Sequence, residues 1–412
     1  MSLIRPFPGL RPAPGQASEV VAPPYDVMSE EEARQMVEGR PWSFLHISRA
    51  EVDLPRGVDP YSPQVYAKAA ENLAAMREAG VLIQDSNPCY YVYRLTMGEH
   101  SQLGVVAAAS VAAYDSGRIK RHELTRPAKE QDRVNQIDAL NAQTGPVFLV
   151  YPEDERIDGL LLDAAEGEPD IDITAADRVR HQLWVLSDSS RTTALGMLFE
   201  QLPALYVADG HHRSAAASRV AARRRAENPQ HSGDEPYDYF LSVIFPQQQT
   251  RILDYNRLVR DLHGLQPEQL LQALADRFRV EPEAQAVRPR QSGEFGMYLA
   301  GKWYRLTLHE KYIPLSDPVG RLDVTLLEQH LLSPILGIED QRTDERIDFV
   351  GGIRGLGALE QRVDSGDWAV AFSLFPTSMK ALMAVSDAGE IMPPKSTWFE
   401  PKLADGLVTH LL

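Results

Sequence analysis

The sequence predicts an α+β protein with a mixed-sheet core and an additional, smaller α/β lobe. A chain of 412 residues exceeds what one hydrophobic core usually serves, so two or three lobes are expected. Residues 90–97 and 104–114 carry the β-branched and aromatic side chains of paired strands. The pattern of predicted helices and strands changes near Asp254. We expect a main domain over 1–255, a smaller lobe over 256–345, and a C-terminal segment, 346–412, that packs back on the main domain.

Composition limits the classes of function. A formal net charge of −16 argues against a general nucleic-acid binder, which would need an excess of Lys and Arg, although local basic pockets stay possible. The single cysteine, Cys89, excludes an internal disulfide framework and fits a reducing compartment. The N-terminus lacks the apolar core of a signal peptide, and no stretch reaches transmembrane length. We therefore expect a cytoplasmic protein with neither a membrane nor a nucleic-acid partner.

The first eighty residues begin with an extended, proline-rich segment. Residues 1–28 are dense in Pro and Gly, which disfavours a helix, and Ser29 is placed to cap the helix that follows. The rigid Pro24-Tyr25-Asp26 turn either holds a carboxylate and a phenol toward a substrate or is a structural turn capped by Asp26. A strand is expected around Trp42–Ser48, and apolar residues at helical spacing predict a helix over Ser62–Ala79.

A polar, highly charged stretch occupies residues 120–133. Mixed charge of this kind is ordinarily a solvated loop and helix start. However, this stretch follows one predicted strand and precedes another, the apolar run Val147–Tyr151. A loop held at both ends by core strands could keep a carboxylate in a fixed position, as a general base requires. Glu123 is therefore a candidate general base, and its neighbours that could bind a substrate or phosphate are His122, Arg121, Arg126 and Lys129.

The stretch 205–224 is the strongest candidate for chemistry. Leu205–Ala208 is a short apolar run typical of a buried strand, and Ser214–Glu227 is rich in Ala and Arg, which favour a helix. A turn between a strand and a helix N-terminus offers backbone N–H groups to an anion, and Gly210 allows a close approach. The alternative is an ordinary turn with Asp209 as N-cap and solvated or packed histidines.

The last quarter holds a second group of candidate anion-binding residues. Residues 395–397 read Lys-Ser-Thr, like the end of a P-loop, but the glycine-rich turn is absent. Lys395, Thr397 and Lys402 around Trp398 and Phe399 could clamp an anion, or the segment could be an ordered tail.

Four motifs together resemble the bacterial and archaeal family catalogued as domain of unknown function 1015, which implies no settled activity. They are Ala22-Pro23-Pro24-Tyr25-Asp26-Val27, Arg121-His122-Glu123-Leu124-Thr125, Ala208-Asp209-Gly210-His211-His212-Arg213 and Pro393-Pro394-Lys395-Ser396-Thr397-Trp398-Phe399.

A narrower likeness concerns the third motif alone. Residues 209–213, Asp-Gly-His-His-Arg, are similar to the phosphate-binding turn of the ParB and sulfiredoxin fold, and most like that of free-serine kinases on this fold. The resemblance implies that nucleotide phosphates bind at Gly210, His211, His212 and Arg213. It also implies that Asp209 assists a metal ion or the acceptor hydroxyl. Those kinases use a glutamate base that does not align securely here, so Glu123 is the candidate and Asp26 the reserve.

The leading hypothesis is a phosphotransferase that uses Mg²⁺ and ATP or ADP to phosphorylate the hydroxyl of a small metabolite, with free serine as one possibility. The rival enzyme is a hydrolase whose metal is bound by His122, His211, His212, Asp209 and Asp26. The third alternative is a nucleotide-sensing protein without turnover. A homodimer is possible for each of them.

Overall fold

The computed structural model describes residues 2–412 and separates the chain into two compact units. The larger unit comprises Met1–Thr250 together with Pro401–Leu412, and the smaller unit is Arg251–Glu400. This division differs from the expected one, because residues 346–400 belong to the smaller unit and only the last twelve return to the larger. Linear order could not show this, since the strands of residues 347–351 and 370–374 pair with a strand that begins at Tyr255.

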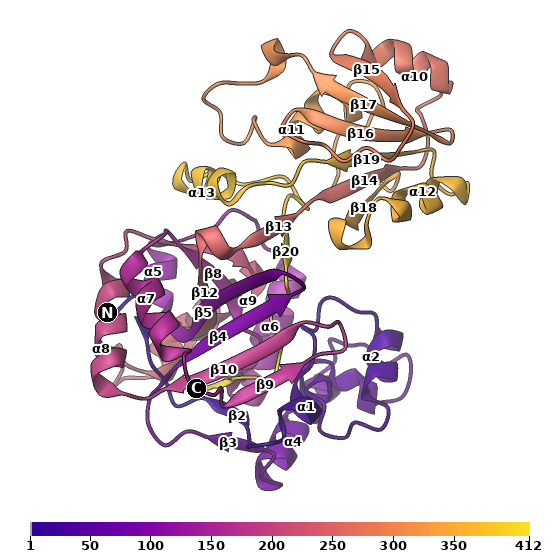
Figure 1. The fold of residues 1–412 in the computed structure, drawn as a ribbon. Coiled ribbons are helices and arrows are strands. Elements are labelled where there is room, and N and C mark those ends of the chain that lie inside the picture. Colours follow the sequence, from indigo (N-terminus) through magenta and orange to yellow (C-terminus); the bar gives the residue numbers. More distant parts are fainter. Residues whose placement is uncertain (1) are drawn as a thin grey trace. The chain divides into compact units, whose positions relative to one another are not determined.

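The larger unit is built on a nine-stranded mixed sheet, which confirms the expected fold class (Figure 1). The strand order is β6-β11-β8-β12-β5-β4-β10-β9, and β1 pairs with β5. Parallel pairing occurs between β6 and β11 and between β8 and β12, and the remaining pairs are antiparallel. The strands are β1 (Ile4–Arg5), β4 (Tyr90–Met97), β5 (His100–Ser110), β6 (Ile119–Lys120), β8 (Val147–Tyr151), β9 (Ile171–Thr174), β10 (Arg180–Leu186), β11 (Leu205–Asp209) and β12 (Tyr239–Pro246).

Nine α-helices accompany this sheet within the described part of the larger unit. They are α1 (Ala17–Val20), α2 (Glu30–Val37), α3 (Leu45–Ser48), α4 (Pro63–Glu78), α5 (Val111–Asp115), α6 (Pro127–Leu140), α7 (Glu155–Ala164), α8 (Ser189–Glu200) and α9 (His211–Glu227). Helix α2 begins with a capping box in which the Ser29 and Glu32 side chains bond each other's backbone N–H. Helices α6 and α9 share a small apolar cluster of Val134, Ile137, Ala216 and Val220, which fixes the start of α9 against its neighbour.

The main core lies between the sheet and the helices that cover it. Its buried residues come from the central strands and from α7, α8 and α9, for example Val105, Leu149, Phe199 and Ala217. A second core joins α3 and α4 to the strands β2 (Leu10–Pro12) and β3 (Leu82–Gln84), which form a separate two-stranded sheet.

The last residues of the chain are part of the larger unit. Strand β21 (His410–Leu411) pairs with β7 (Ala142–Gln143), and isolated bridges join Thr409 to Leu10 and Asp405 to Ala22. The segment from Pro401 onward is therefore fixed between the N-terminal segment and the end of α6.

The smaller unit contains a six-stranded antiparallel sheet in the order β15-β17-β16-β19-β14-β18. The strands are β14 (Tyr255–Val259), β15 (Phe278–Glu283), β16 (Glu294–Leu299), β17 (Lys302–Leu308), β18 (Ile347–Gly351) and β19 (Val370–Leu374). A two-stranded sheet, β13 (Arg251–Leu253) with β20 (Trp398–Glu400), brings together the two ends of this unit. Its α-helices are α10 (Pro267–Leu274), α11 (Asp323–Leu327), α12 (Gly357–Asp364) and α13 (Met379–Asp387).

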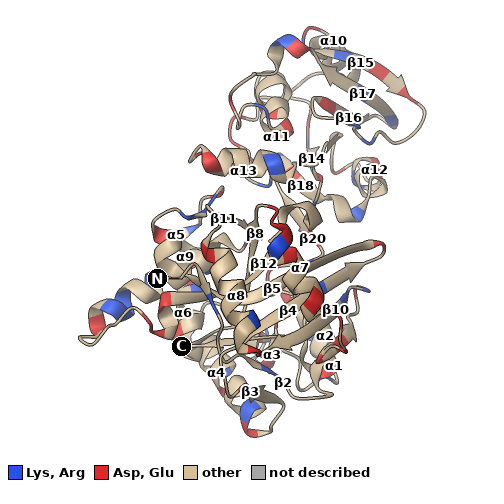
Figure 2. Cartoon of the chain, turned by 60° about the vertical axis from the view of Figure 1, so that its left-hand side comes forward, with Lys and Arg blue, Asp and Glu red and all other residues tan. Residues whose placement is uncertain are grey.

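Charged residues of both signs are interspersed along the elements of each unit (Figure 2). None of the helices in residues 2–412 combines the length and apolarity needed to cross a bilayer.

Gly104 in β5 tests the packing of the main sheet. A Cβ at this position would meet the backbone oxygen of Ile244 and the ring of Phe245, so we expect Gly104→Ala to lower the free energy of unfolding by about 1–3 kcal/mol. The measurement is urea unfolding followed by circular dichroism. The matched control is Gly159→Ala in α7, where a Cβ meets nothing within 4 Å and alanine should be neutral or stabilising. Equal effects of the two substitutions would contradict the prediction.

Candidate functional site

The turn between β11 and α9 is shaped by a bulge and a left-handed glycine. The register of β11 against β8 shifts between Val207 and Asp209, an irregularity that re-aims the side chain at the strand's end. Gly210 then has φ +99°, and a Cβ there would lie 3.3 Å from the Cα of Val147. Glycine is the residue that fits both the conformation and the space. Gly210 is the N-cap residue of the 17-residue helix α9 and has no side chain. The first backbone N–H groups of α9 therefore receive no hydrogen bond from a capping side chain.

Asp209 lies between two cations. Its carboxylate is 3.3 Å from Nζ of Lys402 and 3.7 Å from Nη2 of Arg213. Burial opposes ionisation, but Lys402 and Arg213 together hold the pKa of Asp209 well below its ordinary value. The carboxylate is thus ionised and its charge is matched locally, which removes the conflict between an acidic residue and a phosphate at the same turn.

Arg213 is a buried cation. Its side chain is 10% exposed, and Nη1 donates a hydrogen bond to the carbonyl of Pro146. Burial favours the neutral form, but the charges of Asp26 and Asp209 outweigh it and raise the pKa of Arg213 further. The guanidinium therefore carries a permanent positive charge and belongs to the first turn of α9, the turn that has no side-chain cap.

His122 and His211 form a buried pair of imidazole rings. The ring centroids are 4.5 Å apart with an interplanar angle of 89°, and Nδ1 of His211 is 3.8 Å from a carboxylate oxygen of Glu123. Burial lowers the pKa of His122 to about 4 and, together with the nearby His122, lowers the pKa of His211 well below its ordinary value. Both rings are consequently neutral near pH 7. The His211 ring packs edge-on against His122, and the backbone N–H of His211 belongs to the first turn of α9.

His212 connects α9 to the charged loop that precedes α6. Its Nε2 accepts a hydrogen bond of 3.0 Å from the backbone N–H of Arg126. Burial lowers its pKa as well. In the same loop, the guanidinium of Arg121 lies 5.0 Å from the ring centroid of Tyr114. The hydrogen bond from Arg126 to His212 therefore joins this loop to the first turn of α9.

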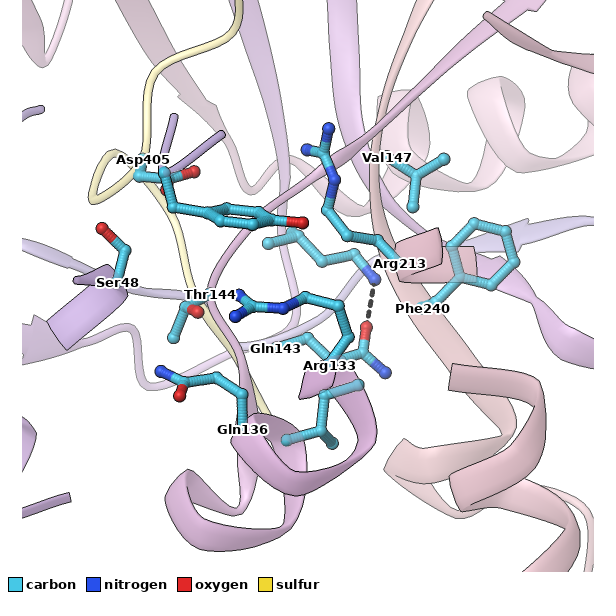
Figure 3. A pocket seen from close by; sticks show the side chains of 13 residues that line it. Ser48, Arg133, Gln136, Gln143, Thr144, Val147, Arg213, Phe240 and Asp405 are labelled. Carbon is cyan, nitrogen blue, oxygen red and sulfur yellow. Dashed lines mark hydrogen bonds between the residues drawn. The ribbon is translucent and has the colours of Figure 1, made fainter. Parts of the chain in front are cut away.

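A small cavity lined by both polar and apolar side chains adjoins Arg213 (Figure 3). Its volume of about 30 Å³ has room for roughly two water molecules. Arg133 and Arg213 both line it, and the guanidinium carbon of Arg133 lies 4.0 Å from the ring centroid of Tyr25. The other polar lining side chains are Ser48, Gln136, Gln143, Thr144 and Asp405.

Asp405 is the unusual member of the cavity wall. It is 1% exposed, and its carboxyl group interacts with the backbone N–H of Tyr25. Burial raises its pKa to about 7, because the attraction of Arg213 compensates only in part. A carboxyl group that changes protonation near neutral pH is suited to accept or donate a proton.

The structure gathers most of the residues that the sequence singles out. Asp209, Gly210 and Arg213 form the turn, and Asp26 acts electrostatically on Arg213 and His212. Residues that meet the turn from elsewhere in the chain are Arg121, His122, Glu123 and Lys402. Lys395 and Thr397 belong to the smaller unit, where Nζ of Lys395 lies 5.7 Å from the ring centroid of Tyr255, and their roles stay predictions.

Sequence reasoning missed two residues of the cavity. Arg133 was hidden in a charged run, and Asp405 lies in an Asp-Gly pair with no motif around it. The local sequence carries no signal for Asp405, because its burial follows from bridging to the N-terminal segment at Ala22.

Comparison with known proteins establishes the family. The family model described as "Protein of unknown function (DUF1015)" matches residues 4–325. The chain is a member of the DUF1015 family. The match includes the first three motifs named above and ends before Lys395, Lys402 and Asp405. No curated protein matches this DUF1015 protein.

Three solved structures show a distant similarity to this DUF1015 protein. A free serine kinase mutant in complex with AMP is 10% identical with a TM-score of 0.33, covering 72% of this chain and 87% of that chain. A conserved hypothetical protein from Pyrococcus furiosus is 13% identical with a TM-score of 0.34, covering 74% and 94%. SbnI with a C-terminal truncation, from Staphylococcus aureus, is 14% identical with a TM-score of 0.35, covering 74% and 86%.

The raised pKa of Asp405 predicts a dependence of stability on pH. In the unfolded chain this carboxyl ionises near its ordinary value, whereas in the folded protein it keeps its proton up to about pH 7. Its contribution to stability is therefore complete below about pH 4 and is lost as the pH rises to about 7. We expect the unfolding free energy of the native chain, relative to Asp405→Asn, to fall over this interval.

The measurement is urea unfolding of both proteins at intervals from pH 4 to pH 8. Asp163→Asn, at an exposed position, is the control and should show no comparable trend. A difference between native chain and Asp405→Asn that is constant with pH would contradict the raised pKa.

Proposed function

We propose that this DUF1015 protein is a nucleotide-dependent phosphotransferase that acts on the hydroxyl group of a small metabolite. The observation that carries the proposal is the turn itself: an uncapped N-terminus of a 17-residue helix, preceded by a left-handed Gly210 and followed within one turn by the buried, permanently charged Arg213. An uncapped helix N-terminus presents N–H groups and the positive end of the helix dipole, which together favour a phosphate group.

Arg213 and Lys402 supply the side-chain charge for such a ligand. A guanidinium can bind two phosphate oxygens at once, and Lys402 adds a compact positive charge on the far side of Asp209. His212 completes the cradle as the residue between the turn and the charged loop. His211 contributes its backbone N–H in this proposal, since its ring lies against His122.

The base that would accept the hydroxyl proton is one of three carboxyl groups, those of Asp26, Glu123 and Asp405. Asp209 is a poor base, because Lys402 and Arg213 depress its pKa. Asp26 and Glu123 are the candidates from the sequence, and the structure adds Asp405, whose pKa of about 7 matches the requirement of a general base near neutral pH. All three lie close to elements of the turn or to Arg213.

The residues of the turn fit a nucleotide phosphate better than they fit Mg²⁺. Both oxygens of Asp209 already face cations, so a metal ion at Asp209 would have to displace the amino group of Lys402. When present with the nucleotide, Mg²⁺ would neutralise charge on the phosphate oxygens. Catalysis would otherwise rest on positioning and charge neutralisation by the residues named above.

Two other functions stay open to the same tests. A metal-dependent hydrolase is favoured by the proximity of His122, Glu123 and His211. A nucleotide-sensing protein would bind through the same turn without turnover.

Nucleotide binding is the first test of the turn. Each charge-assisted hydrogen bond to phosphate contributes about 1.5–3 kcal/mol, so Arg213→Ala and His212→Ala should weaken ADP or ATP binding by roughly 10-fold to 100-fold. Isothermal titration calorimetry of the purified, full-length protein measures this. The matched control is Arg223→Ala on the same helix, whose side chain is 45% exposed and paired with Asp138, and which should bind normally. Unchanged affinity in folded Arg213→Ala would remove the proposed cradle.

Turnover is the second test and separates an enzyme from a sensor. Protein with Mg²⁺ and ATP or ADP is incubated with serine and a panel of other hydroxyl compounds, and phosphorylated product is followed by phosphorus NMR. We expect one of Asp26→Asn, Glu123→Gln and Asp405→Asn to lower the rate by about 10²-fold to 10⁴-fold while nucleotide affinity is retained. Tight nucleotide binding with no product from any acceptor would identify a sensor.

A further inference from the structure

The geometry points to a second site beside the turn: we infer that His122, Glu123 and His211 bind one divalent transition-metal ion of the Zn²⁺ class. The three residues come from two distant segments, the loop after β6 and the first turn of α9. Each offers one ligand atom, and these atoms all lie within 4.8 Å of one another.

The two histidines have ring nitrogens that nothing in the described chain satisfies. His122 is 2% exposed and His211 4% exposed. Nε2 of His211 and one ring nitrogen of His122 lack a hydrogen-bond partner, while the other His122 nitrogen interacts with the backbone of Val207. Buried polar atoms in native proteins are nearly always paired, so an unpaired nitrogen in each of two adjacent rings calls for an explanation. A bound metal ion accounts for them, because it takes the lone pair of a neutral imidazole nitrogen.

The charges around the pair bear on whether a cation can be held there. The carboxylates of Glu123 and Asp209 would balance the ion's charge, since both lie beside His211. The positive charge of Arg121, which is also close to His211, would repel the metal ion and partly offset this attraction.

The donor set selects the kind of ion. Two imidazoles and one carboxylate suit Zn²⁺ and neighbouring transition ions, whereas Mg²⁺ and Ca²⁺ prefer oxygen ligands. Bonds of about 2.1 Å place tetrahedral ligands about 3.4 Å apart, so the three groups must close by roughly an ångström. Glu123 can move by that amount, because its side chain is 48% exposed on a loop.

A second group in the chain, His231, Glu235 and Asp238, is already held together by ion pairs, although one carboxylate oxygen of Asp238 lacks a hydrogen-bond partner. His231 Nδ1 makes a 2.9 Å ion pair with Glu235, and Asp238 accepts a hydrogen bond from Nε of Arg225. Its residues already bind each other and an arginine, so it serves as the internal control.

The consequence for the fold is a clamp between two segments. A metal ion shared by the loop residues and His211 would fasten residues 121–126 to the N-terminus of α9, next to the hydrogen bond from Arg126 to His212. A ligand that binds only the folded state also raises thermal stability.

The test uses the full-length protein, stripped with a chelator and titrated with Co²⁺, whose visible absorption reports coordination by nitrogen ligands. We expect one equivalent to bind, to be displaced by Zn²⁺, and to raise the melting temperature. His122→Ala and His211→Ala should abolish the absorption. Glu123→Gln should weaken binding by at least the 10-fold to 100-fold that even an outer-shell partner contributes. His231→Ala should behave like the native chain.

Circular dichroism verifies that each variant is folded. If His122→Ala does not fold, Glu123→Gln and His122→Gln give the same information with smaller changes in volume. Absence of Co²⁺ and Zn²⁺ binding in the native chain would overturn the inference, and so would loss of the signal in His231→Ala with retention in His122→Ala. The inference does not rest on the proposed phosphotransferase function, because nucleotide affinity is measured separately on Arg213 variants.

Discussion

The buried charge of Arg213 is the constraint around which the larger unit is arranged. An isolated charge in a protein interior is strongly unfavourable unless opposite charges and hydrogen-bond acceptors surround it. Here the carbonyl of Pro146 accepts from the guanidinium, Asp209 lies one helical turn before it, and Asp26 adds a second negative charge. These groups come from the N-terminal segment, from the end of β11 and from the residues just before β8. Binding the guanidinium therefore requires three separate parts of the chain to be correctly placed.

The same balance explains why two acidic residues near Arg213 behave so differently. Asp209 is matched by Lys402 as well as Arg213, so it remains ionised. Asp405 is almost fully buried, and burial raises its pKa to about 7. One cluster thus contains a permanently charged carboxylate and a carboxyl group poised near neutrality. Such a pair divides the tasks of holding charge and exchanging protons.

Local sequence was sufficient for the turn but not for its surroundings. The apolar run at 205–208, the glycine and the Ala/Arg-rich run each have a propensity that agrees with the observed strand, turn and helix α9. The helix expected over 62–79 likewise appears as α4, with proline at its first position. In contrast, the strand expected around Trp42–Ser48 is helix α3 at its end. Short apolar runs of this kind suit a buried helix as well as a strand, and tertiary packing in the second core decides between them.

Long-range contacts explain the rest. Gly104–Tyr114 was expected to be one strand, but β5 ends at Ser110, whose hydroxyl caps the short helix α5. The role of Asp405 depends on its pairing with a segment almost four hundred residues away, and the extent of the smaller unit depends on strands that meet across a hundred residues. Motifs found the residues of the turn because those lie together in sequence. No local rule could find groups that only the folded chain brings together.

The return of residues 401–412 to the larger unit has a consequence for biosynthesis. Lys402 and Asp405 leave the ribosome only after the entire smaller unit. Until then, Asp209 lacks the ion pair with Lys402, one of the two cations beside its carboxylate. This centre can therefore be completed only after residues 251–400 have been synthesised, and not by the folding of the first 250 residues alone.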